Sequence, residues 1–287
     1  MRRSVFIASF FIAHFLIAQI NHPKASPSSR VEQEVGLSKI TIDYSRPAVK
    51  GRKIFGDLVP YGRIWRVGAN ESTKFTVDSE VKIIGNTLSK GTYALYAFPE
   101  NGDWEIAFHS NIAHWGDGRN AYNPEEDVFR IKVTPERIPF HQENFLISFD
   151  SLTHNSVTMQ WLWDRTKISI PIRFDTDGLM REEIQKQLQD NPTAQTYYEA
   201  ARYLQEQGKQ YDTALAYLNK AIELGGDTYY FHRVKSMVEA ALGDYVRAIS
   251  SAEKSLALAD AQDKDEFVRM NQKNIELWTA RLETQHK

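Results

Sequence analysis

Apolar and polar residues alternate along short segments between Leu37 and about Phe174. In residues 155–163 the apolar side chains occupy every second position, from Val157 to Trp163, and a period of two places them on one face of a β-strand. About nine such strands without helices between them indicate an antiparallel sandwich or barrel. The clearest segments are KITIDY, DWEIAFH, DVFRIKV, NFLISFD, NSVTMQWLW and TKISIPIRF.

Two turn sequences connect neighbouring strands. Gly85 and Asn86 lie between VKII and the run that leads to GTYALYAF, and Asn101 and Gly102 lie between GTYALYAF and DWEIAF. Both dipeptides favour tight turns between antiparallel strands. Two successive hairpins are therefore predicted.

The pattern changes after Asp175, where the apolar period becomes 3.6 and Ala, Leu, Gln, Glu and Lys replace the β-branched residues. Such residues form helices. The fold class is therefore α+β as two domains, an antiparallel β-sandwich over residues 36–175 and a helical domain over residues 176–287.

The helical half contains an internal repeat. GKQYDTALAYLNKAIEL aligns with GDYVRAISSAEKSLAL, and Tyr211 and Tyr245, like Ala214 and Ala248, are 34 residues apart. This is the length of the tetratricopeptide repeat. Two helical hairpins of this kind are predicted, and DKDEFVRMNQKNIELWTARLE is expected to form the helix that covers the last apolar face.

The chain begins with MRR and the apolar run SVFIASFFIAHFLIA. A charged start followed by a run of this length predicts a signal peptide over residues 1–20, cleaved near Ala18 or Gln19. The alternative is an N-terminal membrane anchor, although the run is short for a span and His14 interrupts it. Export to the periplasm or the cell exterior is expected, with no membrane span after cleavage. Residues 21–35 are rich in Pro, Ser and charge and are expected to form a flexible linker.

Composition excludes several classes of function. The chain is 42% hydrophobic and 25% charged, as in folded proteins. Its formal net charge of −2 provides no overall field for nucleic acid. It contains no cysteine, which excludes thiol catalysis, cysteine-ligated metals and disulfides.

The segment HSNIAHWGDG offers His109, His114 and Asp117 as metal ligands. Its spacing dictates no third ligand, and the chain has no H-E-x-x-H helix, so no metal is predicted. GDGRNAYNPEED lacks the glutamate position of a calcium-binding EF-hand. Without a P-loop, a G-x-G-x-x-G or a G-x-S-x-G motif, we predict no cofactor, assign no catalytic residue and lean against an enzyme.

Residues 46–73, RPAVKGRKIFGDLVPYGRIWRVGANEST, combine many cations with aromatic residues and glycines. Too irregular for a helix or strand, the stretch is expected to be an ordered loop held to the sheet by its aromatic rings. In one interpretation, Arg66 and Glu71 form a structural ion pair while Asn70 bonds to backbone groups. In the other, the stretch binds an anionic group such as a carboxylate or an acidic sugar. The candidate ligand-binding residues are Arg46, Lys50, Arg52, Tyr61, Trp65, Arg66, Asn70 and Glu71.

Two long motifs in this stretch, S-R-P-x-V-K-G-R-x-I-F-G and V-P-Y-G-x-x-W-R-x-G-A-N-E-x-T, resemble an uncharacterised family of exported bacterial domains, domain of unknown function 2911. The resemblance covers about residues 37–174 and includes VKIIGNTLSKGTYALYAFP and DWEIAF. It implies a Bacteroidetes-like source and, in some members, helical repeats after the β domain. It brings no activity and no catalytic residue.

The leading functional hypothesis is a non-enzymatic binding or scaffold protein. Its β-sandwich would present a ligand pocket for a small anion or a glycan, and its helical repeats would bind a protein or peptide. The first alternative is a hydrolase of envelope polymers that uses Glu71 as acid or base. The second is a carbohydrate-binding module that stacks sugars on exposed tryptophans of the β half.

Overall fold

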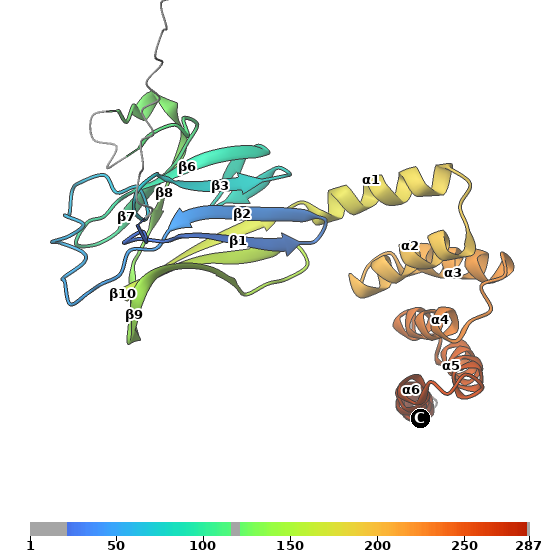
Figure 1. Cartoon of the computed structure of the whole chain (residues 1–287). Helices are drawn as coiled ribbons and strands as arrows, with labels where there is room; N and C mark the ends of the chain where they lie inside the picture. The colour runs from blue at the N-terminus through green and yellow to red at the C-terminus, as the bar shows by residue number, and fades with distance from the viewer. Residues whose placement is uncertain (1–21, 116–120, 286–287) are drawn as a thin grey trace, which may run out of the picture. The chain divides into compact units, whose positions relative to one another are not determined.

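The computed structural model describes residues 22–115 and 121–285. The predicted signal peptide and Asp117 lie outside these ranges. The chain divides into two compact units between Thr176 and Asp177, next to the expected boundary at residue 175. The first unit consists of two antiparallel sheets and the second of six helices (Figure 1), as the predicted fold class required.

The larger sheet has six strands in the order β1-β2-β3-β6-β7-β8. Each pairs antiparallel with its neighbour. The β6–β7 hairpin turns at Asn101 and Gly102, as predicted. The strands are β1 (Ser28–Val35), β2 (Ser38–Ser45), β3 (Thr73–Val77), β6 (Gly91–Phe98), β7 (Trp104–His109) and β8 (Asp127–Val133).

The smaller sheet has the order β5-β4-β10-β9. Its strands are β4 (Val81–Ile83), β5 (Asn86–Leu88), β9 (Glu136–Asp150) and β10 (Ser156–Phe174). NSVTMQWLW and TKISIPIRF belong to one strand, β10, because irregularities on both sides of Asp164 shift the register without ending the pairing with β9. Asp164 has a φ of 52°, which explains the interrupted alternation.

Side chains from both sheets form one core. It includes Phe75 and Phe108 from the larger sheet and Trp161 and Ile170 from the smaller one. Among the tryptophans of this unit, Trp115 is 73% exposed, whereas the others are buried. This confirms that most of them belong to the core.

The segment expected to be a linker was predicted wrongly over Ser28–Val35. These residues form β1 and pair along their full length with β2. Exposed residues such as Arg30 and Glu34 alternate with Val31 and Val35, which face the core. The many Ser and charged residues concealed this edge strand, since only one of its faces is covered.

The stretch 46–73 is irregular and held to the core by aromatic residues, as expected. The Phe55 ring lies 4.6 Å from that of Trp104 and 5.7 Å from that of Trp65, in edge-on arrangements. A further ring contact of 6.1 Å joins Phe55 to Trp163 of β10. These rings anchor the loop over one end of the sandwich.

The second unit contains six helices, from α1 to α6. Those that begin at Tyr211 and Tyr245 repeat with the predicted offset, and Ala214 and Ala248 are fully buried. This arrangement is compatible with tetratricopeptide-like hairpins. In the described residues no helix is long and apolar enough to cross a membrane. The helices are α1 (Thr176–Gln189), α2 (Ala194–Glu206), α3 (Tyr211–Glu223), α4 (Tyr229–Ala241), α5 (Tyr245–Asp260) and α6 (Asp265–Gln285).

Candidate metal centre

A polar cluster lies on the face of the larger sheet that points away from the main core. The register places Ala94 of β6, His109 at the end of β7 and Asp127 at the start of β8 in one row. Because Leu95 and Phe108 belong to the main core, their strand neighbours Ala94 and His109 face the other way. His109 is nevertheless fully buried, under residues that follow β7.

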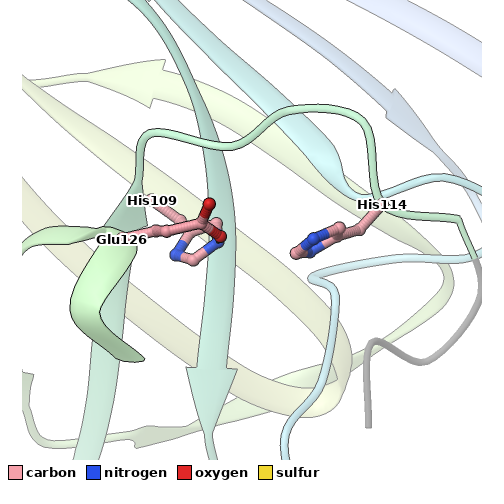
Figure 2. A group of neighbouring side chains, drawn as sticks. All are labelled: His109, His114 and Glu126. Atoms are coloured by element: carbon pink, nitrogen blue, oxygen red, sulfur yellow. The ribbon is translucent and has the colours of Figure 1, made fainter. Parts of the chain in front are cut away.

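Three potential metal ligands converge here. The ligand atoms of His109, His114 and Glu126 lie within 4.8 Å of one another. Figure 2 shows the three side chains pointing toward a common space. His114 comes from the loop after β7, and Glu126 ends a short 3₁₀ helix, Pro124–Glu126, immediately before β8.

The His109 ring is oriented by Asp127. Its Nδ1 lies 2.9 Å from Asp127 Oδ1, and an ionised carboxylate can only accept a hydrogen bond. Nδ1 therefore carries a proton, and Nε2 lies 3.3 Å from Oε2 of Glu126. His109 Nε2 is buried and makes no hydrogen bond with the described residues.

His114 has a similar supporting contact. Its Nδ1 lies 3.1 Å from the hydroxyl oxygen of Tyr96, so its Nε2 remains available to a metal. The centroids of the His109 and His114 rings are 5.5 Å apart. Metal-binding histidines commonly have their second nitrogen fixed by such an outer partner.

A hydrogen-bond network fixes Asp127. Arg130 donates to its Oδ2 from Nε at 2.8 Å, and the Tyr122 hydroxyl donates to its Oδ1 at 2.6 Å. Burial, followed by the hydrogen bond to Asp127, raises the pKa of Tyr122, so the phenol keeps its proton. The Tyr122 ring also stacks on His109 with a centroid distance of 4.9 Å. These contacts hold the imidazole in one orientation.

The motif-rich stretch before β3 supports this cluster. Trp65 and Ala97 exchange two backbone hydrogen bonds of 2.8 Å, beside Tyr96. Glu71 forms an isolated β-bridge with Trp115, next to His114. The stretch therefore connects β6 to the loop that carries His114.

The spacing of two of the three ligand atoms fits a metal with nitrogen and oxygen ligands. Two ligand atoms bound to tetrahedral zinc at about 2.1 Å are about 3.4 Å apart, and His109 Nε2 and Glu126 Oε2 are 3.3 Å apart. Two imidazoles and one carboxylate suit zinc or iron(II) and are unlike the all-oxygen sites of calcium and magnesium. Among residues 22–115 and 121–285 three protein ligands converge, which leaves coordination positions for water or a substrate.

The sequence-predicted ligand-binding residues are only partly brought together. Lys50, Arg52, Trp65 and Arg66 line one pocket. Arg46 instead donates from Nε to the Phe145 carbonyl at 2.9 Å. Binding by these residues stays a prediction.

The other three predicted residues lie outside the lining of that pocket. Asn70 donates to the Ser26 carbonyl and to Ser45 Oγ, both at 3.1 Å. Tyr61 is 41% exposed and Glu71 is exposed. The ion pair between Arg66 and Glu71 stays a prediction.

Sequence reasoning identified His109 and His114 but missed Glu126. The third ligand depends on the antiparallel pairing of β7 with β8, which returns residues 126 and 127 to the end of β7. The available signal was the acidic run of residues 125–127, which leads into DVFRIKV. The expectation that no metal binds is untested, and the observed convergence argues against it.

The β unit is thus a two-sheet sandwich with a polar cluster of three potential metal ligands on the outer face of its larger sheet. A family model described as "Protein of unknown function (DUF2911)" matches residues 26–172, and the chain belongs to this family. No curated protein and no solved structure matches the chain.

Proposed function

We propose that the β unit binds a divalent first-row transition metal, zinc in the simplest case, through His109, His114 and Glu126. One observation carries the proposal: His109 Nε2 is buried without a hydrogen bond from the described residues, while Nδ1 is held by Asp127. A buried nitrogen without a partner is costly. A metal ion on that lone pair removes the cost.

The rival arrangement needs no metal. A doubly protonated His109 would lie between the carboxylates of Asp127 and Glu126. That arrangement does not explain why His114 lies close to His109. The two carboxylates would already accept both N–H groups of the His109 imidazolium, so a second imidazole would make no further hydrogen bond with it. A metal accounts for both rings and for their outer partners, Asp127 and Tyr96.

The number of ligands among the described residues, three, favours a reactive centre over a structural one. Structural zinc sites are closed by four protein ligands, whereas three protein ligands leave room for water or a substrate. A metal in an open site can activate water or polarise a carbonyl or phosphoryl group. If the protein is a hydrolase, we propose the metal centre rather than Glu71 as the origin of its chemistry.

Metal analysis tests the proposal. The full chain should bind one zinc ion in a calorimetric titration, and Glu126→Gln should weaken binding by tenfold or more, in line with the roughly 10- to 100-fold effects seen even for outer-shell residues. Glu125→Gln is the matched control, because Glu125 is its exposed neighbour in the same 3₁₀ helix. Equal affinities of the two variants would refute the assignment.

The pH dependence separates a metal from a proton at His109. Both imidazoles must be neutral to bind zinc, so zinc affinity should fall as the pH is lowered, with protons released on binding. Calorimetry in two buffers of different ionisation enthalpy measures that release. If zinc binding releases no protons at any pH tested, the histidines are not the ligands.

We further infer that the metal-binding unit acts after export to the periplasm or the exterior of a Bacteroidetes-like bacterium. The charged and apolar start of the chain supports this proposal. Sequencing the N-terminus of protein recovered from the periplasm should show cleavage between about residues 18 and 25. Recovery of the uncleaved chain in washed membranes would instead indicate an anchor.

We also propose that the helical unit binds a protein or peptide. A cleft of about 490 Å³ is lined by Tyr198 of α2, Tyr230 and Arg233 of α4, and Phe267 of α6. Burial lowers the pKa of Arg233. A photo-crosslinking residue at Gln195, which lines the cleft, should capture a discrete partner in the native host, whereas one at exposed Glu253 of α5 should not.

A further inference from the structure

A second polar pocket lies in the β unit. It has a volume of about 290 Å³ and lies between the 46–73 stretch, residues 25 and 26 near the start of the described chain, and Trp163 of β10. Lys50, Arg52 and Arg66 line it, and none of the described lining residues is acidic. We propose that this pocket binds the oxyanion group of a small ligand, independently of the metal centre.

Arg52 is held in place without being neutralised. Its Nε donates to the Val49 carbonyl at 3.0 Å, and a terminal nitrogen donates to the Ala48 carbonyl at 2.5 Å. Neutral carbonyls orient a guanidinium and leave its full positive charge available. A cation that is already ordered loses little side-chain entropy when it binds an anion.

Glu143, an acid that feels the charge of Arg52, already contacts other groups. Glu143 accepts a hydrogen bond from the Lys50 backbone amide at 2.9 Å and lies 2.9 Å from His141 Nε2. Its pKa is lowered first by the His141 contact, then by the Lys50 amide, with a smaller effect from the charge of Arg52. Glu143 therefore offsets part of the positive charge of Arg52, but it is not one of the residues that line the pocket.

The pocket wall is built from unusual backbone. Lys50, which lines the pocket, has a φ of 48°, and Val67, between the lining residues Arg66 and Gly68, has a φ of 54°. The left-handed region is rare for a β-branched residue such as Val67. Gly68 lines the pocket, and a Cβ there would lie 2.8 Å from the Ser45 carbonyl oxygen. Strain of this kind persists where the surrounding structure holds it, frequently at ligand sites.

The chemistry of the lining defines the ligand class. Guanidinium groups match the planar forks of carboxylates and phosphates, and the volume is at the small end for organic ligands. Trp65 and Val59 add apolar walls, which suit a ligand with a small body attached to its anionic group. A carboxylate and a phosphate share this chemistry, so the test includes both.

The experiment titrates inorganic phosphate and glucuronate into the full chain at low ionic strength, with sodium chloride as the ionic control and unfolding temperature as the readout. At least one probe should raise that temperature. Arg52→Gln should weaken its apparent affinity by about tenfold or more, as expected for a lost charged hydrogen bond. Lys53→Gln removes the same charge from an exposed residue outside the pocket and should leave the affinity unchanged.

Two further variants test the pocket independently of Arg52 and of the metal centre. Lys50→Asn removes a pocket charge while tolerating the left-handed backbone, and it should weaken binding even if Arg52→Gln does not fold. Glu126→Gln should bind the probe normally, since the metal centre is elsewhere. No response to either probe, or equal weakening by Arg52→Gln and Lys53→Gln, would overturn the proposal.

Discussion

His109 at the end of β7 and Asp127 at the start of β8 are paired on neighbouring strands of the larger sheet, with His109 Nδ1 2.9 Å from Asp127 Oδ1. This pairing determines which histidine nitrogen is free for a metal. Their strands also bring Glu126, the residue before Asp127, to the side of His109.

The first prediction concerns Asp127. Asp127→Asn removes the negative charge that makes the imidazole a better ligand, so zinc affinity should fall roughly 10- to 100-fold. Competition with a chromophoric chelator measures the affinity. Glu105→Gln is the control, because Glu105 also pairs with Arg130, at 3.0 Å, without touching His109. If both variants bind zinc equally well, Asp127 has no role in ligand orientation.

Local patterns predicted most of the fold for a physical reason. Strands with one face in the core must alternate, and β2, β7 and β8 were recognised on that basis. β1 was missed because an edge strand with Ser, Arg and Glu on its exposed face has a weak apolar signal. The single strand β10 was divided in two because the irregularity at Asp164 breaks its period.

The site was less predictable, since it depends on contacts between distant residues. His109 and His114 lie in one short segment and were noticed together, whereas Glu126 becomes a neighbour only through the register of β7 and β8. Lys50, Arg52 and Arg66 line one pocket, whereas Arg46 donates a hydrogen bond to the backbone carbonyl of Phe145. The number of charged residues in a segment does not predict such a contact with a distant strand.

A second prediction follows from His141, which contacts Glu143 at 2.9 Å and Asp164 at 3.0 Å. The pKa of His141 is raised, chiefly by its hydrogen bond with Glu143. Its stabilising contribution is therefore present below the unfolded value of about 6.5 and lost as the pH rises through the folded value. His141→Gln should lower the unfolding temperature near about pH 6 and leave it unchanged near about pH 9. A loss of equal size at both pH values would show that protonation is not involved.

The third prediction tests the helical repeat. Ala214 of α3 and Ala248 of α5 are fully buried, so Trp at either position should reduce the free energy of unfolding by roughly 1–3 kcal/mol or more through overpacking. Ala216→Trp and Ala257→Trp place the same side chain on exposed positions of the same helices and should be nearly neutral. Chemical denaturation measures the difference. Equal stability of buried and exposed variants would contradict close helix contacts at these alanines.

The last prediction concerns Tyr96, whose hydroxyl oxygen lies 3.1 Å from His114 Nδ1. Burial raises the pKa of Tyr96, so its hydroxyl keeps its proton. When a metal occupies Nε2, the neutral imidazole carries its hydrogen on Nδ1 and must donate, and the Tyr96 oxygen accepts it. Tyr96→Phe keeps the buried ring but leaves that donor without its partner, which permits the other tautomer.

The zinc affinity of Tyr96→Phe should therefore fall by about tenfold, at the lower end of the effects of residues that contact a metal ligand. Nitrogen NMR of the metal-free variant should show that the His114 tautomer shifts toward the Nε2-protonated form. Tyr93→Phe is the matched control, because Tyr93 lies on the same strand and bonds to the Ser89 carbonyl at 2.9 Å. If the two variants behave alike, Tyr96 only fills space. If Tyr96→Phe alone loses affinity while its unfolding temperature is retained, the hydroxyl positions His114 for the metal.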